Sequence, residues 1–382
     1  MSIEKLMRVL HAMRTYGING GERQLARLFS QQNSVQLQES FLFVYHDPDC
    51  EEFFLGEAPN LALHSLHKAL VPRSRALKEF LSLLPKLLFL QFCFWRFIKS
   101  QRFDACVIHG FQAALIAWPS VCLMRNIGFA YMHRGNKRQA VTDPIFRLLF
   151  APFRVVVGNS DATTKSLARY VTENKLFTIA NGIDCNRFLL PCGLKGSVST
   201  QHDLVTLITV GRLIDGKGLG FLIESMKLLK QVERYFRLYI IGEGPKRPEL
   251  EALISEMKLE GQVHLLGRSN NIAADLTNSD IFLFASEKEG LSNAVLEAMA
   301  AGLPSVVVDA EGVSECHLDG ITAHVVQRSP QAFVEAILSL LRNAKAKRDM
   351  GQAATDLVRK KFSSEINRQR FNDLYSQIVE KK

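Results

Sequence analysis

Residues 280–309 read DIFLFASEKEGLSNAVLEAMAAGLPSVVVD, which predicts a strand, a glycine-containing turn, a helix and a second strand. The two apolar runs, 281–285 and 305–308, are short and uninterrupted, as is typical of parallel strands that are covered on both faces. Gly302-Leu303-Pro304 ends the helix between them. The stretch therefore reads as a βαβ unit and predicts an α/β fold built on parallel sheets.

Two carboxylates lie where such a unit binds ligands. Ligands sit beyond the carboxyl ends of the strands in open α/β sheets, so Glu289, just after the first strand, is expected to line a crevice rather than a core. Glu297 lies one turn beyond Asn293, on the same face of the helix. Two glutamates at this spacing do not identify a function by themselves.

Strand-like and helical patterns recur on both sides of this unit, and they predict two doubly wound domains. A chain of 382 residues with 47% hydrophobic content is long enough to bury two cores. The composition shifts to Pro, Gly, Ser, Thr and Lys from Leu190 to Asp203, which predicts a linker. The predicted strands are 6–10, 41–45, 105–108, 154–157 and 177–180 before this linker, and 205–210, 238–241 and 263–265 after it.

A loop with two cations precedes the helix predicted over 221–230. Its sequence is Val210-Gly211-Arg212-Leu213-Ile214-Asp215-Gly216-Lys217-Gly218. Backbone N–H groups and the helix dipole favour anions at a helix entrance, and a guanidinium with an ammonium can grip a diphosphate. The alternative is a pair of solvated loop cations.

The segment from Glu289 to Glu297 resembles the E-x7-E element of retaining, nucleotide-sugar-dependent glycosyltransferases, chiefly family 4 of the glycosyl transferases group 1, which have the GT-B fold. The loop 210–218 resembles the G-R-L-x-x-x-K-G element of the same enzymes. This resemblance implies two Rossmann-like domains that face each other across a cleft. Residues 1–190 would bind the acceptor, residues 191–361 would bind the nucleotide-sugar donor, and a helix over 362–382 would cross back to the first domain.

The resemblance also implies roles for residues of the second domain. Arg212 and Lys217 would stabilise the departing nucleoside diphosphate. Glu297 would hold the ribose hydroxyls, and Glu289 would bind a hydroxyl of the donor sugar. The other residues expected to bind the donor are Gly20, Gly21, Gly211, Gly242, Arg268, Gly290, Leu291, Ser292 and Asn293.

The first domain contributes a glycine-rich loop and two histidines. Gly17-Ile18-Asn19-Gly20-Gly21 follows the first strand, but the G-x-G-x-x-G spacing of dinucleotide sites is absent. By resemblance, His133 would reach the donor sugar and His109 would bind the acceptor. The alternative for each histidine, and for Arg268, is a structural role.

The implied reaction is transfer of a hexose-type sugar with retention of anomeric configuration. No residue presents itself as a covalent nucleophile, so cations and helix N-termini would stabilise the leaving group. We expect no metal, because Asp47-Pro48-Asp49, which has the form of a D-x-D metal motif, reads as a turn. We also expect no cofactor, because the nucleoside diphosphate sugar would be a substrate.

The composition indicates an anionic partner and a reducing compartment. The net charge is +9, which suits nucleic acid, a nucleotide phosphate or an anionic membrane, and charge does not choose among them. The resemblance to glycosyltransferases implies no nucleic-acid partner. The seven cysteines have no paired spacing, and neither a signal peptide nor a membrane-spanning run is visible. The chain is therefore expected to be cytoplasmic.

Residues 66–99 combine basic side chains with Leu, Phe and Trp95. A basic amphipathic segment of this kind can lie on the cytoplasmic face of an anionic membrane, in which case the acceptor would be a lipid-linked glycan. The alternative is a helix that faces the core and has a solvated basic side.

The resemblance implies a glycosyltransferase of cell-envelope polysaccharide or lipopolysaccharide synthesis, with a glycan or lipid-linked acceptor. Two alternatives stay open. A nucleotide-sugar epimerase of GT-B architecture would consume donor without an acceptor, and a noncatalytic nucleotide-sugar-binding protein would bind donor without turnover.

Overall fold

A computed structural model of the chain describes residues 6–15, 17–31, 36–67, 77–133, 143–188, 204–287, 289–310, 313 and 315–380, with the backbone alone for 77–85 and 143. The chain divides into two compact units. Unit 1 consists of Met1–Gly182 with Ser364–Lys382, and unit 2 consists of Ile183–Ser363. The boundaries predicted from the sequence lie after residue 190 and before residue 362.

Unit 1 is built on a seven-stranded parallel sheet in the order β3-β2-β1-β4-β5-β6-β7. The strand order reverses next to β1, as in a doubly wound fold. The strands are β1 (Met7–Met13), β2 (Leu37–Phe43), β3 (Ala62–Ser65), β4 (Ala105–His109), β5 (Gly128–His133), β6 (Val155–Gly158) and β7 (Leu176–Thr178). The helices are α1 (Gly20–Ser30), α2 (Pro48–Glu57), α3 (Leu77–Gln101), α4 (Phe111–Leu123), α5 (Asp143–Phe150), α6 (Asp161–Leu167) and the short 3₁₀ helix η2 (Glu173–Lys175).

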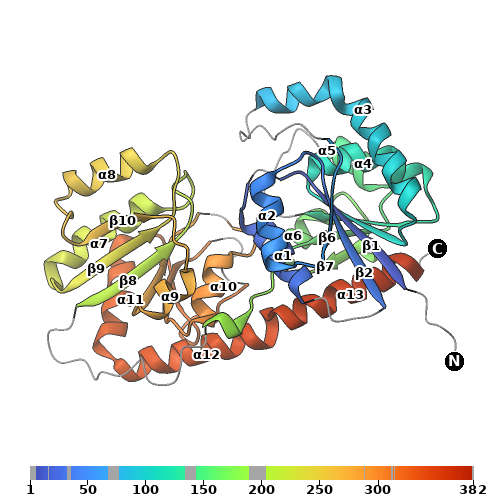
Figure 1. Ribbon diagram of the computed structural model, residues 1–382. Coiled ribbons are helices and arrows are strands. Elements are labelled where there is room, and N and C mark those ends of the chain that lie inside the picture. The colour runs from blue at the N-terminus through green and yellow to red at the C-terminus, as the bar shows by residue number, and fades with distance from the viewer. Residues whose placement is uncertain are drawn as a thin grey trace. The chain divides into compact units, whose positions relative to one another are not determined.

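The last helix, α13 (Ser364–Glu380), completes unit 1 although its residues come after unit 2 in the chain (Figure 1). Its buried side, which includes Phe371, Leu374 and Ile378, packs into the core of unit 1. The backbone approaches β5 so closely that a Cβ on Gly128 would overlap the carbonyl of Ile378. Arg154 donates to that carbonyl at 2.5 Å. Helix α13 is therefore part of the core of unit 1.

Unit 2 is built on a six-stranded parallel sheet in the order β10-β9-β8-β11-β12-β13. Its strands are β8 (Val205–Val210), β9 (Phe236–Ile241), β10 (Val263–Gly267), β11 (Ile281–Phe284), β12 (Ser305–Val308) and β13 (His324–Val326). Its helices are η3 (Cys185–Phe188), α7 (Leu219–Val232), α8 (Arg247–Glu256), α9 (Ile272–Thr277), α10 (Asn293–Ala300), α11 (Pro330–Arg342) and α12 (Ala344–Phe362). The predicted βαβ unit is confirmed as β11-α10-β12, and the α/β class with two Rossmann-like sheets is confirmed as well.

Several strand bounds differ from those predicted. Strand β2 begins at Leu37 rather than at residue 41, because Glu39 and Ser40 are buried within it. Glu39 can be buried since Arg368 from α13 donates two hydrogen bonds to it. Strands β3 and β13, which consist of four and three residues, were not predicted. Within the described part of the chain, no helix has both the length and the apolar character that crossing a bilayer requires.

Candidate functional site

The carboxyl ends of β8 and β11 bring a cation and a carboxylate together in unit 2. Lys217 Nζ donates to Glu289 Oε1, and the two side chains are 23% and 17% exposed. Ser286 Oγ lies 2.8 Å from the same carboxylate oxygen and 3.2 Å from the carbonyl of Gly216. Ser286 itself is buried. The buried hydroxyl of Ser286, a residue not predicted from the sequence, thus holds the Glu289 carboxylate of this pair in place.

The loop 211–218 packs directly on the end of β11. The N–H of Glu287 donates to the Gly216 carbonyl at 2.9 Å. Gly218 precedes α7 with a φ of +67°, and a Cβ there would overlap the carbonyl of Ala285. A side chain at this position would therefore separate the loop from β11 and pull Lys217 away from Glu289.

The loops after β8 and β9 are also in contact with each other. The N–H of Leu213 donates to the carbonyl of Glu243 at 3.0 Å. Gly242 has a φ of +145°, and a Cβ on it would overlap the carbonyl of Gly211. The absence of a side chain at Gly242 therefore serves the packing of the two loops, whatever it also allows a ligand to do.

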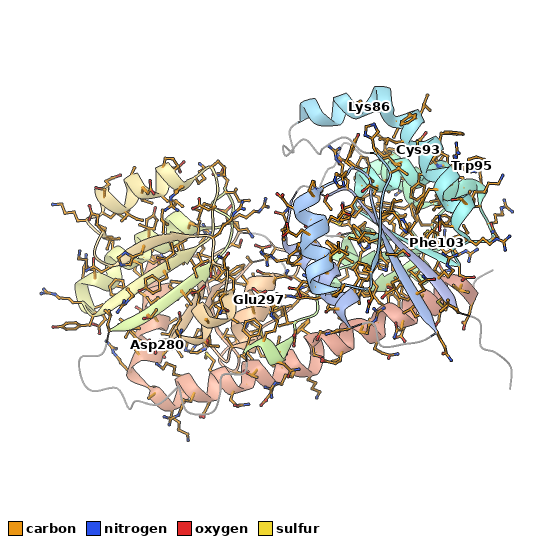
Figure 2. The ribbon with its side chains drawn as sticks, viewed as in Figure 1. Lys86, Cys93, Trp95, Phe103, Asp280 and Glu297 are labelled. Carbon is orange, nitrogen blue, oxygen red and sulfur yellow. The ribbon has the colours of Figure 1, made fainter. Side chains whose placement is uncertain are left out.

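Helix α10 carries Glu297 in its second turn, as Figure 2 shows. The side chain is half-buried. The turn between β11 and α10 holds Gly290, buried Leu291, the N-cap residue Ser292 and Asn293, the first residue of the helix. One βαβ unit thus carries Glu289 after its first strand and Glu297 on its helix.

The two predicted arginines lie at the ends of two strands of the same sheet. Arg212 follows β8 and Arg268 follows β10, and both side chains are exposed. Between these strands Arg247 donates to Glu243 Oε1 at 2.9 Å and to the carbonyl of Leu265 at 3.0 Å. The carboxyl edge of β8, β9 and β10 therefore carries three arginines, of which Arg247 is paired with the carboxylate of Glu243.

The other predicted residues lie in unit 1. Gly20 and Gly21 form the first turn of α1, where the N-cap residue Asn19 and Glu22 cap each other's backbone N–H groups. His133 ends β5, and its Nδ1 lies 3.1 Å from the hydroxyl of Tyr131.

His109 ends β4 and is 3% exposed. Its Nε2 lies 2.9 Å from Nδ1 of His11, a buried residue of β1 that sequence analysis did not select. A polar residue within an apolar first strand was the only signal in the sequence that pointed to it.

Asp47 caps a helix. Its carboxylate accepts from the N–H of Cys50 at 3.2 Å and from Thr15 Oγ1 at 3.1 Å, and Pro48 is the first residue of α2. The turn predicted for Asp47-Pro48-Asp49 is therefore the start of α2. Among the described residues, no group of three or more His, Cys, Asp or Glu side chains is placed to hold a metal ion.

Solved structures with the same architecture define the fold of the whole chain. The sucrose-phosphate synthase of Thermosynechococcus elongatus has a TM-score of 0.81 and 15% identity, with 98% of this chain and 100% of that chain covered. A glycosyltransferase of Rickettsia africae has a TM-score of 0.79 and 18% identity, with 98% and 99% covered. Both support the GT-B fold, which consists of two Rossmann-like domains.

Residues 195–357, most of unit 2, match the family model for glycosyl transferases group 1, so this part of the chain is similar to that family. The lipopolysaccharide core biosynthesis glycosyltransferase LpsD of Rhizobium meliloti is 28% identical over 189 residues, which cover 49% of this chain and 54% of LpsD. An N-acetylgalactosaminyltransferase of Campylobacter jejuni that acts on a diphospho-undecaprenol substrate is 31% identical over 193 residues, 50% of this chain and 48% of its own length. The chain spans about half the length of these relatives.

Proposed function

We propose that this protein is a retaining, metal-independent glycosyltransferase that moves a sugar from a nucleoside diphosphate sugar to a glycan or lipid-linked acceptor. The pairing of Lys217 with Glu289 next to the N-terminus of α7 carries the proposal. An ammonium at a loop–helix junction suits a diphosphate, and a carboxylate beside it suits the hydroxyls of the attached sugar.

When the donor binds, its groups would replace the contact between Lys217 and Glu289. The diphosphate would take Lys217 and the exposed Arg212, and the donor sugar would take Glu289. Ser286 would keep Glu289 in place during this exchange, because its hydroxyl lies 2.8 Å from the carboxylate. Glu297 on α10 offers two acceptor oxygens, which suit the paired hydroxyls of a ribose.

The chemistry would be largely electrostatic. The bond from the anomeric carbon to the diphosphate oxygen breaks, the acceptor oxygen bonds to the same face of the sugar, and the proton of the acceptor hydroxyl would pass to the departing diphosphate. The leaving group gains negative charge as the sugar becomes oxocarbenium-like, so a preorganised Lys217 and Arg212 would stabilise the transition state more than the bound donor. These two cations would take the part that a divalent ion takes in other enzymes.

The names of the relatives support this class of acceptor. LpsD belongs to lipopolysaccharide core synthesis, and the Campylobacter enzyme acts on a lipid-linked glycan. Other relatives are named for colanic acid and amylovoran synthesis. We therefore propose a role in building a cell-envelope polysaccharide or lipopolysaccharide on the cytoplasmic side of the membrane.

Helix α3 supports contact with that membrane. Leu90, Phe94 and Ile98 recur every four residues and are buried in the core of unit 1. Its other side exposes apolar rings and chains together with cations, and Figure 2 shows Lys86 and Trp95 on this helix. The exposed apolar and basic residues among 86–101 are Lys86, Leu88 (78%), Phe89 (56%), Phe92 (55%), Arg96 and Lys99. Arg73 and Arg75 of the predicted segment lie outside the described residues.

A donor screen followed by a transfer assay tests the proposal. UDP-, GDP-, ADP- and dTDP-sugars are first compared by the rise they cause in the melting temperature of the protein. The best donor is then incubated with and without a membrane lipid extract as acceptor, and the anomeric configuration of the product is read by NMR. We expect donor consumption that depends on acceptor and a product with retained configuration. Consumption without acceptor would indicate an epimerase, and binding without turnover a noncatalytic protein.

A further inference from the structure

The strand end that leads to Glu289 is held by Arg328, a residue not predicted from the sequence. Arg328 follows β13, which β12 separates from β11 in the sheet order. Its Nη1 donates to the carbonyl of Ala285 at 3.0 Å, and its Nη2 donates to Glu287 Oε1 at 3.2 Å. One guanidinium therefore contacts both ends of the segment 285–287, which begins the loop after β11.

The face of the same guanidinium covers the start of α7. Arg328 Cζ lies 5.0 Å from the centroid of the Phe221 ring, and a cation over an aromatic face is attracted to it. Phe221 is the third residue of α7 and is 9% exposed. Its ring packs edge-on against Phe333 of α11, with the centroids 5.4 Å apart. Arg328 thus joins the end of β11 to the first turn of α7.

The segment that Arg328 contacts is bonded in turn to both partners of the candidate site. The N–H of Glu287 donates to the carbonyl of Gly216 at 2.9 Å, and Lys217 is the next residue of that loop. The hydroxyl of Ser286 lies 2.8 Å from Glu289 Oε1. A shift of this segment would therefore move the ammonium and the carboxylate of the site together.

The contacts of Arg328 are not equal in weight. The Arg328 and Glu287 side chains are 37% and 59% exposed, so their ion pair contributes little by itself. Ala285 and Phe221 are buried, and they are the contacts that fix the guanidinium. A guanidinium can reach two acceptors and lie flat on a ring at the same time, whereas the single ammonium of a lysine cannot.

We propose that Arg328 is a positioning residue that fixes the segment 285–287 and, through it, holds Glu289 and Lys217 in the geometry that sugar transfer requires. It acts on the reaction through these two side chains. The inference rests on the proposed function for the reaction that the pair serves, whereas the fixing of the segment can be measured without any substrate.

Amide hydrogen exchange on the ligand-free chain tests whether Arg328 holds the segment. The N–H of Glu287 is the reporter, because it donates to the carbonyl of Gly216 in the neighbouring loop. In Arg328→Ala its exchange rate should rise about tenfold, while the N–H of Phe282, which donates to the carbonyl of Pro304, keeps its rate. Equal changes at both amides, or no change at Glu287, would overturn the inference.

Steady-state kinetics tests the link to the reaction. In Arg328→Ala, kcat with the preferred donor should fall about tenfold, because Lys217 and Glu289 are no longer held in place. The KM for the acceptor should stay unchanged, since the acceptor is expected to bind unit 1. Arg328→Lys keeps the charge without the fork and should recover only part of the lost rate. An unaltered kcat in Arg328→Ala would overturn the inference even if Glu287 exchanges faster.

Arg237→Ala is the matched control. Arg237 also lies over an aromatic ring, 5.7 Å from the centroid of Tyr239, and donates to the hydroxyl of that residue at 2.8 Å. It is the second residue of β9, so it lies at the amino end of the parallel sheet, opposite the edge that carries the site. Its removal should change neither the exchange of Glu287 nor kcat.

The two readouts separate this inference from the proposed function. Faster exchange at Glu287 in an Arg328→Ala variant of a protein that transfers no sugar would leave the hold on the segment standing and overturn the function. Transfer with the same kcat and the same exchange in both proteins would leave the function standing and overturn the inference. Melting curves show whether each variant is folded.

Discussion

Arg368 and Glu39 are 329 positions apart in the chain, yet their side chains form two parallel hydrogen bonds of 2.8 Å in the core of unit 1. The Glu39 side chain is fully buried and that of Arg368 is 11% exposed. A two-pronged guanidinium–carboxylate contact of this kind holds α13 against β2 with a fixed register.

We expect Arg368→Ala to destabilise unit 1 by about 3–5 kcal/mol, because it leaves the Glu39 carboxylate buried without its cation. Denaturation followed by tryptophan fluorescence measures the change. Lys246→Ala removes the cation of an exposed pair with Glu249 in unit 2 and should leave the transition unchanged. Equal midpoints for Arg368→Ala and the unaltered protein would contradict the assigned role.

Lys217→Ala and Glu297→Gln should each reduce sugar transfer at least about a hundredfold, which corresponds to about 2.7 kcal/mol of lost transition-state stabilisation. The first change removes the cation that would neutralise the leaving diphosphate, and the second replaces one of the two acceptor oxygens that would hold the ribose. Steady-state kinetics with the preferred donor measures both. Lys230→Ala is the control, since Lys230 is an exposed lysine of α7 that donates to the carbonyl of Lys258. Near-normal turnover in either site variant would remove that residue from the site.

Ser286→Ala should lower turnover about tenfold, the effect of losing one hydrogen bond that holds Glu289. The protein should stay folded because only one buried oxygen is removed. Ser305→Ala takes a hydroxyl from an equally buried position on β12 and should leave the rate unaltered. If both serine variants behave alike, Ser286 has no special part in orienting the carboxylate.

Transfer should be independent of divalent metal ions, because Arg212 and Lys217 supply the positive charge beside the leaving group. The measurement is the initial rate after dialysis against a chelator. Loss of activity that magnesium or manganese restores would refute this expectation.

Helix α3 should bind anionic vesicles in a salt-sensitive manner, since each cation near such a surface contributes on the order of 1 kcal/mol. Cosedimentation with phosphatidylserine vesicles at low salt measures it, with phosphatidylcholine vesicles as the comparison. Replacing Lys86, Arg96 and Lys99 by Glu should abolish binding, and Phe89→Ser with Phe92→Ser should weaken it at every salt concentration. Equal partitioning to both vesicle types would show that the exposed side of α3 is only a solvated surface.

The sequence was sufficient to predict those elements whose structure depends on a local pattern of residues. The apolar runs 281–285 and 305–308 predicted β11 and β12, since parallel strands buried on both faces need such runs. Because βαβ geometry brings strand ends together, the pairing of Lys217 with Glu289 also lay within reach of the sequence.

The parts that the sequence did not reveal depend on partners far away in the chain. Strand β2 contains Glu39, and the sequence pattern of a strand does not place a glutamate in a core. Its burial becomes understandable only once Arg368 is seen to donate to it. The contact between His11 and His109 likewise involves Tyr375 of α13, which lies 2.7 Å from His11 Nε2. No residue near His11 in the sequence indicates that contact.

The position of α13 has a consequence for biosynthesis. Residues 364–380 are translated after unit 2, yet they supply the partners that Glu39, His11 and Gly128 require. The ribosome therefore exposes the first sheet long before the helix that closes its core is available, while every strand of unit 2 is made in the interval. Unit 1 can therefore mature only after unit 2 has been synthesised, so nascent unit 1 must stay protected from aggregation until α13 has left the ribosome.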